Sequence, residues 1–369
     1  MSASPVVLSY YLGLVYIITS GAIVTAQNIV NDVSNWGTSY DGSNYQYGRA
    51  GYCSSGTQCV HIDNCPFLYK VINNACAYTT RIGELGCGYQ GSGMVCCPTT
   101  STTHSTNFNG QLCGQSMVAA APYNRIGAYP WVARVIFKNA GSGETKFPCS
   151  GSIISNRVVL TAAHCVLTKT DSYKLFGVRI GEWSSKTDLD CGQEFCALPH
   201  QDITISHVIV HPGYEQRTFK DNIALLVLND RANFTVTAQP ICLPQHWAGG
   251  SNYGLVIGWG KISGQHEAPP FQQVIQLPIL GLQQCSHVYG RTIPITENNL
   301  CVGGLAGRDV CEGFGGSPLV EEQGGSYFQI GILSFGSDQC GAPGVPSVYT
   351  NVRRYVNWIK DNIPTFRNK

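Results

Sequence analysis

The stretch Cys311-Glu-Gly-Phe-Gly-Gly-Ser-Pro-Leu319 organises the interpretation of the whole chain. Its glycines and proline predict a tight turn. Because Gly315 has no side chain, this position cannot form a covalent bond to a substrate. Around the turn, short apolar runs are separated by Gly, Pro and Asn, a pattern that indicates a two-barrel β protein. These runs are 153–154, 158–160 and 223–228, and helical spacing at Val352, Val356, Ile359 and Ile363 predicts a terminal helix.

Length and composition bound the class of protein. The chain has 369 residues, of which 43% are hydrophobic and 12% charged, and it contains 42 glycines. This length predicts two or more folded units, and the glycine content favours a loop-rich β architecture. The formal net charge is +1 and no long run of like charge occurs. We therefore expect neither a nucleic acid nor a membrane surface as a partner.

Seventeen cysteines indicate an oxidising compartment. The apolar run Val6–Val24, followed by Thr25-Ala26, predicts that residues 1–26 are a signal peptide and that the protein is secreted. No Lys or Arg precedes Arg49, and the run approaches membrane-spanning length, so an uncleaved anchor is the competing interpretation.

The rest of the chain divides by composition. Residues 27–52 form a polar extended arm, 98–117 a Ser/Thr-rich linker, and 118–369 the main domain. Within the linker, Pro98–Asn107 is a tether that keeps its neighbours independently mobile. Residues 53–97 hold seven cysteines and are too short to fold without covalent support. Zinc is the rival use of such density, but adjacent Cys96 and Cys97 cannot easily both bind one tetrahedral ion, which favours disulfides.

This cysteine-rich segment resembles the clip domain of arthropod clip-domain serine proteases. The resemblance lies in Cys53, Cys59-Val-His-Ile-Asp-Asn-Cys65-Pro, Cys87-Gly and Val95-Cys96-Cys97-Pro98. It implies the pairs Cys53–Cys96, Cys59–Cys87 and Cys65–Cys97, although sequence alone cannot choose the connectivity. Cys76 has no partner in this pattern; it is either a buried thiol or an intermolecular bridge that would make an oligomer.

From about residue 113 the chain resembles a trypsin-like protease domain. The resemblance implies an all-β-dominated fold, a double β-barrel with a C-terminal helix, preceded by the clip domain. The run Gly181-Glu-Trp183, Thr187-Asp-Leu-Asp-Cys191 and Cys196-Ala-Leu-Pro is typical of clip-domain proteases. The resemblance also implies five disulfides, which are Cys113–Cys242, Cys149–Cys165, Cys191–Cys196, Cys285–Cys301 and Cys311–Cys340.

Acyl transfer in this family needs a nucleophile, a histidine and a carboxylate. Thr161-Ala-Ala-His164-Cys165 resembles the histidine motif, and Asp221-Asn-Ile-Ala-Leu-Leu226 resembles the aspartate motif. The turn at 311–319 resembles the nucleophile loop Gly-Asp-Ser-Gly-Gly-Pro, with Gly315 at the serine position and Phe314 at the aspartate that receives the activated N-terminus. Ser317 is two residues too far along to substitute. The family's spacing puts the new N-terminus near Val118, and no usual activation sequence is found there.

The specificity pocket is half retained by the same resemblance. Asp309 lies where trypsin-like enzymes bind Lys or Arg, and Ser334-Phe335-Gly336 resembles the substrate-binding strand. Ser347 replaces a usual glycine and should narrow the pocket. Burial of an unpaired Asp309 would be costly, so we expect it to be solvated or satisfied locally.

Two further sites rest on short patterns. Glu182, Asp188, Asp190 and Glu194 form either a calcium site or a solvated acidic loop, and no other metal or cofactor is expected. Asn233-Phe-Thr235 is an N-glycosylation sequon.

The loss of Ser and Asp in the 311–319 turn predicts a secreted, catalytically inactive protease homologue that binds other proteins. The resemblance implies a regulator of extracellular immune cascades, with cascade proteases and prophenoloxidase as partners in melanisation. A venom or salivary decoy that inhibits such a cascade is the alternative, and an active endopeptidase with a displaced nucleophile is a third. Sequence does not distinguish activation from inhibition.

Overall fold

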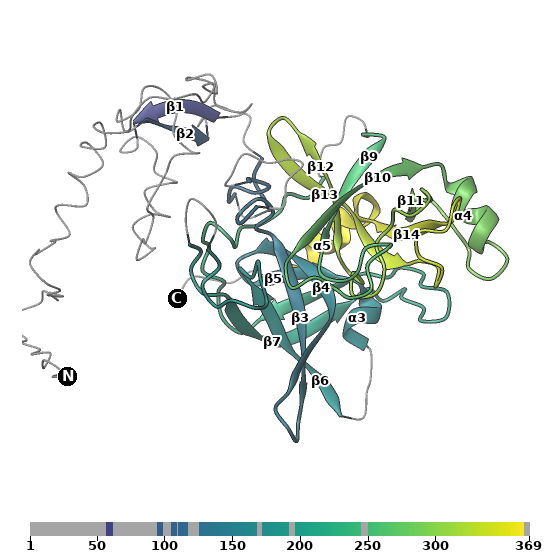
Figure 1. Cartoon of the computed structure of the whole chain (residues 1–369), viewed down its shortest axis with the longest axis horizontal. Helices are drawn as coiled ribbons and strands as arrows, with labels where there is room; N and C mark the ends of the chain where they lie inside the picture. The colour runs from purple at the N-terminus through teal and green to yellow at the C-terminus, as the bar shows by residue number, and fades with distance from the viewer. Residues whose placement is uncertain are drawn as a thin grey trace, which may run out of the picture.

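The computed structural model describes residues 57–61, 94–98, 105–108, 110–116, 125–167, 172–191, 196–244 and 250–364. Most of the secondary structure in these residues is β-strand. Twelve strands form two closed barrels of six strands each (Figure 1). The predicted trypsin-like double β-barrel is therefore confirmed. None of the helices in the described part of the chain is long and apolar enough to cross a membrane.

The first barrel has the strand order β3-β4-β5-β8-β7-β6, with antiparallel neighbours. The most deeply buried of its strands are the neighbours β5 and β8, in which every residue is buried. These two strands are the continuous apolar runs of the sequence, as expected for strands covered on both faces. Their bounds are β3 Val132–Asn139, β4 Thr145–Ser155, β5 Val158–Thr161, β6 Tyr173–Ile180, β7 Gln201–Val210 and β8 Ala224–Leu228.

The second barrel has the order β10-β11-β14-β13-β12-β9, again with antiparallel neighbours. The β12–β13 hairpin turns at Gly324 and Gly325, whose φ angles are +59° and +80°. A two-residue turn with both φ angles positive matches the twist of the strands that it joins, and glycine adopts it without strain. The strands are β9 Tyr253–Gly258, β10 Gln273–Leu280, β11 Asn299–Gly303, β12 Pro318–Gln323, β13 Ser326–Phe335 and β14 Pro346–Asn351.

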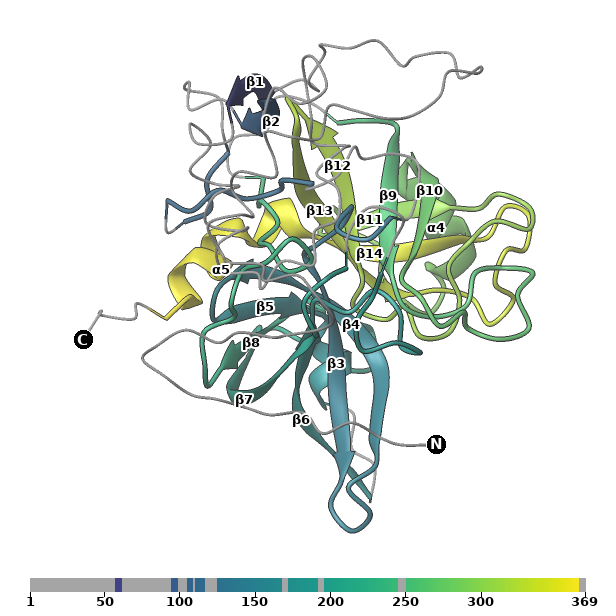
Figure 2. The same cartoon turned by 60° about the vertical axis from the view of Figure 1, so that its left-hand side comes forward.

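Helices are few and short: α3 Ala163–Leu167, α4 Leu282–Tyr289, the 3₁₀ helix η2 Val352–Tyr355 and α5 Val356–Asn362. The predicted terminal helix is confirmed as η2 continuing into α5. Val352 and Ile359 are fully buried and belong to the same apolar cluster as the core of the first barrel. The C-terminal helix therefore crosses back from the second barrel and lies beside β5 of the first (Figure 2).

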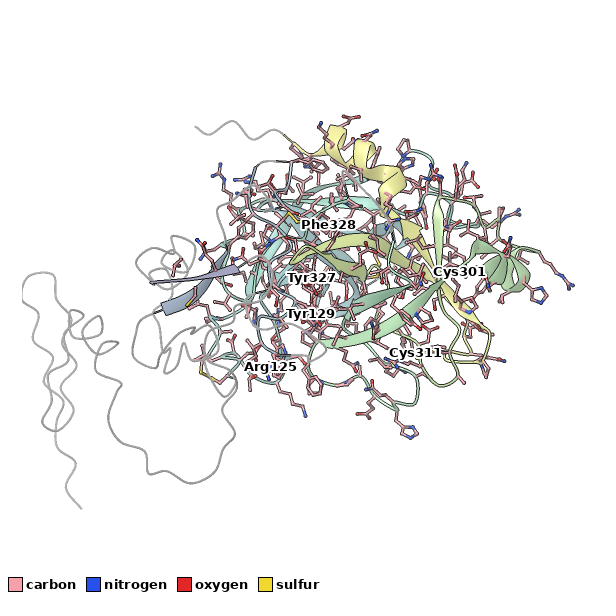
Figure 3. All side chains as sticks on the ribbon, turned by 90° about the horizontal axis from the view of Figure 1, so that it is seen from above. Arg125, Tyr129, Cys301, Cys311, Tyr327 and Phe328 are labelled. Atoms are coloured by element: carbon pink, nitrogen blue, oxygen red, sulfur yellow. A yellow bond between two sulfur atoms is a disulfide. The ribbon has the colours of Figure 1, made fainter. Side chains whose placement is uncertain are left out.

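An aromatic contact joins the two barrels. Trp131 is fully buried, and its ring lies 5.2 Å from that of Tyr327 on β13, measured between centroids. The ring of Tyr129 is 6.0 Å from that of Tyr327 in an edge-to-face arrangement, and the two residues lie side by side in Figure 3. Such pairs add stabilisation beyond the area that they bury. The apolar cluster of the first barrel consequently extends across the junction to Tyr327, and the second barrel also has a cluster of its own.

Part of the predicted linker is packed rather than mobile. Asn107 is buried and its Nδ2 donates a hydrogen bond of 3.2 Å to the carbonyl of Ile154 on β4. Gly114 donates its N–H to the carbonyl of Pro240 and accepts the N–H of Tyr327, and Cys113 is disulfide-bonded to Cys242. The expectation of a mobile tether is therefore wrong for residues 105–107, because the buried amide of Asn107 fixes them to β4. Residues 110–116 are held to the barrels by the predicted Cys113–Cys242 disulfide and by backbone hydrogen bonds.

The predicted clip segment contributes one described hairpin. Strand β1, Thr57–His61, pairs antiparallel with β2, Met94–Pro98, and Cys59 lies opposite Cys96. Cys59 is disulfide-bonded. Its predicted partner Cys87 lies outside the described residues, as do the other positions for which predictions were made: 1–26, 27–52, Cys53, Cys65, Cys76 and Val118.

Candidate functional site

Both barrels hold the 311–319 turn in place. Ser150 on β4 donates its N–H to the carbonyl of Gly315 at 2.8 Å, and Gly316 donates its N–H to the carbonyl of Leu333 on β13 at 3.0 Å. Gly316 has a φ of +77°, and a Cβ there would lie 2.4 Å from the carbonyl oxygen of Ser150. Only glycine fits, because both the backbone conformation and the available space exclude a side chain. The turn keeps a fixed shape between the barrels.

Gly315 is the residue of this turn that faces His164. A Cβ added to Gly315 would lie 3.0 Å from His164 Nε2. His164 is on α3, which follows the buried strand β5 directly and is tied to β4 by the predicted disulfide Cys149–Cys165. The resemblance was therefore right to place Gly315 beside the histidine, and the bond-forming side chain that acyl transfer needs is lacking at this position.

The residue that contacts the second ring nitrogen of His164, Nδ1, is Asn222 and not Asp221. Asn222 is fully buried, and its Nδ2 lies 2.9 Å from His164 Nδ1. The same amide nitrogen donates to Ser334 Oγ at 2.7 Å, and Asn222 Oδ1 accepts the backbone N–H of His164 at 3.0 Å. An amide thus occupies the position where acyl transfer requires a carboxylate.

The assignment of Asp221 as the carboxylate was wrong. Its Oδ1 accepts a 2.6 Å hydrogen bond from Tyr355 Oη, and its Oδ2 lies 3.7 Å from His211 Nδ1. Thr161 pairs with Ala224, which puts residue 222 level with the start of α3. Asp221 lies in a turn before β8 with a φ of +49°, a left-handed conformation, and its carboxylate is directed to Tyr355 and His211 instead of His164. The sequence signal that could have identified Asn222 is its place directly before the buried run 223–228.

Asn222 determines which nitrogen of His164 carries the proton. The amide can be placed in only one way, because its oxygen must accept the backbone N–H of His164. Its NH₂ group therefore donates to Nδ1, and a neutral ring that accepts at Nδ1 has its proton on Nε2. Burial lowers the pKa of His164 and so favours this neutral form. The ring presents an N–H donor toward Gly315, whereas a general base must present a lone pair.

Phe314 and Ser317 point away from His164. Phe314 is fully buried in the core of the second barrel, and a Cβ on Gly258 or Gly260 would lie within 2.9 Å of its ring. Ser317 Oγ also faces Gly258, and it has no hydrogen-bond partner within the described residues. Phe314 therefore acts as an apolar core residue, and Ser317 is not within reach of the histidine.

The predicted specificity-pocket residues do come together. Asp309 is buried, accepting the N–H of Val310 at 2.8 Å and the hydroxyl of Ser347 at 2.9 Å. Burial raises the pKa of Asp309 to about 6, and these two hydrogen bonds oppose the shift only in part. Ser347 Oγ would lie 2.8 Å from a Cβ on Gly336. The carboxylate of Asp309 thus has local hydrogen-bond partners, as expected. One of them, the hydroxyl of Ser347, also occupies the space beside Gly336.

Phe219, which the sequence did not single out, covers one side of His164. Its ring lies 5.9 Å from the imidazole and 5.1 Å from the ring of Phe335, measured between centroids. Its φ is +53°, a conformation that is strained for a bulky side chain. A pocket of about 260 Å³ adjoins the histidine on this side, lined by His164, Leu167, Tyr214, Gln216 and Phe219.

The acidic loop does not converge on one ion in the described residues. Glu182 Oε2 lies 3.0 Å from Arg179 Nη1, and Asp190 Oδ2 accepts the backbone N–H groups of Trp183 and Ser184. Asp188 is directed to His200 at 3.2 Å, and Glu194 lies outside the described residues. Cys149, His164 and Cys165 are close enough to hold a metal, but the two sulfurs are bonded to each other.

Asn233, the sequon residue, is exposed.

The other disulfides predicted for this domain are also present, and they are Cys113–Cys242, Cys191–Cys196, Cys285–Cys301 and Cys311–Cys340.

Two barrels with a histidine and a glycine-rich turn at their junction define a trypsin-like protein, and the trypsin family model matches residues 120–359. Similarity to curated proteins extends further toward the N-terminus. The chain is 36% identical to CLIP domain-containing serine protease B4 of Anopheles gambiae, over 83% of this chain and 89% of the relative. It is 34% identical to phenoloxidase-activating factor 3 of Holotrichia diomphalia, over 83% and 90%. The corresponding values for serine protease ea of Drosophila melanogaster are 32%, 83% and 88%. The chain therefore belongs to the arthropod clip-domain serine protease family.

Proposed function

We propose that this chain is a catalytically inactive member of its family and acts by binding other proteins. The observation that carries the proposal is the composition of the site: Gly315 faces His164 Nε2, and Asn222 contacts Nδ1. Nucleophile and carboxylate are both replaced, so two independent requirements of acyl transfer are unmet. The backbone of the turn is nevertheless anchored to both barrels, which supports a role for the shape of the site rather than its chemistry.

An active enzyme with a displaced nucleophile is the competing function. Ser317 is the nearest hydroxyl in the turn, and its Oγ faces Gly258 on β9. The test is labelling with an active-site-directed phosphonate, followed by hydrolysis of Arg and Lys esters after limited proteolysis. We expect neither. Labelling or hydrolysis that disappears in a His164→Ala variant would overturn the proposed inactivity.

We further propose that the protein is secreted and regulates an extracellular protease cascade of arthropod immunity. The disulfides support an oxidising compartment. Three relatives have names that refer to phenoloxidase activation, namely phenoloxidase-activating factors 3 and 1 and phenoloxidase-activating enzyme 1. Cascade proteases and prophenoloxidase are accordingly the proposed partners, with the protein as a cofactor in melanisation.

The sign of the effect is measured by adding the purified protein to a defined mixture of prophenoloxidase and its activating protease. A cofactor raises the rate at which phenoloxidase activity appears, in proportion to the protein added and with no effect when the protease is omitted. A decreased rate would overturn the cofactor role and support the decoy. Heat-denatured protein is the control for nonspecific effects.

A further inference from the structure

The Cys149–Cys165 disulfide lies directly against His164 and Gly315. Cys165 Sγ is 3.4 Å from His164 Nε2. A Cβ on Gly315 would lie 3.3 Å from Cys149 Sγ and 3.6 Å from Cys165 Sγ. Both sulfurs therefore lie within van der Waals distance of the position that a side chain at residue 315 would occupy.

The imidazole presents a hydrogen-bond donor to this disulfide. Asn222 donates to Nδ1, so the proton of the neutral ring is on Nε2, the nitrogen that faces Cys165 Sγ. An N–H donor stabilises a thiolate more than it stabilises a neutral sulfur, because hydrogen bonds to charged acceptors are the stronger ones. Cys165 is consequently placed to leave as a hydrogen-bonded thiolate when the disulfide is attacked.

The two cysteines are both buried, with Cys149 at 7% exposed and Cys165 at 1%. Attack on Cys149 expels Cys165, the sulfur beside the donor, so the more exposed residue is attacked and the hydrogen-bonded sulfur leaves. Among the other disulfides of this domain, Cys113–Cys242 and Cys285–Cys301 are more deeply buried, with no cysteine above 1% exposed. Within the described residues, no histidine contacts a sulfur of these two pairs.

We propose that Cys149–Cys165 is a redox-labile disulfide that exchanges with small-molecule thiols, with His164 as the positioning residue. A thiolate attacks Cys149 Sγ, a new S–S bond forms, and the Cys149–Cys165 bond breaks with its electron pair on Cys165. His164 Nε2–H stabilises that thiolate without transferring its proton, and water protonates the sulfur afterwards. A second thiol releases Cys149, so two thiols become one external disulfide and the protein gains two cysteine thiols.

The test follows reduction of each disulfide in the folded full-length protein. The protein is incubated with dithiothreitol at pH 7 without denaturant, and new thiols are trapped by alkylation at timed intervals and assigned by mass spectrometry. We expect Cys149–Cys165 to be reduced at least about tenfold faster than Cys113–Cys242 and Cys285–Cys301, a factor in keeping with one hydrogen bond to a charged group.

Two variants separate the role of the histidine from simple access. Asn222→Asp keeps the imidazole but, in the neutral ring, moves its proton to Nδ1, so the Nε2 lone pair faces the sulfur. Because the new carboxylate raises the pKa of His164, this variant and the parent are compared at about pH 9, where the ring is neutral. His164→Phe keeps a ring of similar size without a donor. Both should slow reduction of Cys149–Cys165 about tenfold and leave the two reference disulfides unchanged. Circular dichroism verifies that each variant is folded. If one variant does not fold, the reduction rate of the other variant decides the test. Equal rates for all three disulfides in the parent protein, or unchanged exchange in a folded variant, would overturn the proposal.

Discussion

Restoring serine at position 315 alone should not restore a working nucleophile. Asn222 donates to His164 Nδ1 and leaves the proton on Nε2, the nitrogen that must accept the serine proton. In trypsin-like enzymes an asparagine at this position lowers kcat by about 10⁴ through the same wrong tautomer, equivalent to about 5.5 kcal/mol in the activation barrier. Gly315→Ser is also tight, since its Cβ would lie 3.0 Å from Nε2 and the ring must withdraw slightly.

Adding Asn222→Asp to Gly315→Ser removes the tautomer block. The carboxylate would accept hydrogen bonds from the groups that now surround the amide, namely the backbone N–H of His164, its Nδ1–H and Ser334 Oγ–H. We therefore expect the double variant to react with a fluorescent fluorophosphonate about 10⁴ times faster than Gly315→Ser. Labelling is the appropriate assay because it reports the serine–histidine pair and does not require a well-formed substrate pocket.

Three controls make this prediction decisive. The parent protein and Asn222→Asp alone should remain unlabelled, because neither has a nucleophile facing His164. Ser317→Ala in the double variant should leave labelling unchanged, since Ser317 Oγ points to Gly258. The tautomer argument is refuted if Gly315→Ser is labelled as fast as the double variant. If labelling of the double variant depends on Ser317, the placement of the nucleophile position is wrong.

Three other perturbations test the same site. Phe314→Ala should lower the free energy of unfolding by about 3–5 kcal/mol, measured by chemical denaturation, because the ring is fully buried in the second barrel; a loss below about 1 kcal/mol contradicts its role in the core. Burial raises the pKa of Asp309 to about 6. Between about pH 4 and 6 the folded protein therefore keeps a proton that the unfolded chain has lost. The free energy of unfolding should consequently fall by up to about 3 kcal/mol as the pH rises through that window. Subtracting the profile of Asp309→Asn isolates this effect, and identical profiles would mean that the carboxyl is not perturbed. Ser347→Gly should increase the affinity for benzamidine about tenfold in calorimetry, since it frees Asp309 of a hydrogen bond and opens space beside Gly336; unchanged binding would show that Ser347 does not restrict the pocket.

The sequence predicted the fold and most of the site because those features depend on residue type at fixed spacing. Strands β5 and β8 are uninterrupted apolar runs, and all five disulfides expected in the main domain form. Asp309 and Ser347 were expected in one pocket and are joined by a hydrogen bond. Gly315 was expected beside His164 and lies there.

What the sequence did not predict depends on turn conformation and on long-range contacts. Asp221 and Asn222 are adjacent polar residues, and the turn that contains Asp221, with its φ of +49°, leaves Asn222 as the one that contacts His164. Phe219 contacts Phe335 across 116 residues of sequence, because a residue with positive φ directs its ring toward the other barrel. The packing of residues 105–108 and 110–116 likewise depends on hydrogen-bond partners, an acceptor at Ile154 on β4 and a donor at Tyr327 on β13, that no local pattern identifies.

The Cys113–Cys242 disulfide has a consequence for how this protein would respond to a protease. Any single cut between residues 113 and 242 leaves two polypeptides that remain covalently joined, because the bond spans a separation of 129 residues. The cysteine-rich N-terminal segment would then stay attached to the barrels after such a cut, and the cleaved protein would migrate as one species until it is reduced. After a cut between residues 98 and 113, the Cys113–Cys242 bond would no longer join that segment to the barrels. The position of a nick relative to one cysteine thus decides whether this disulfide keeps the two products of processing together.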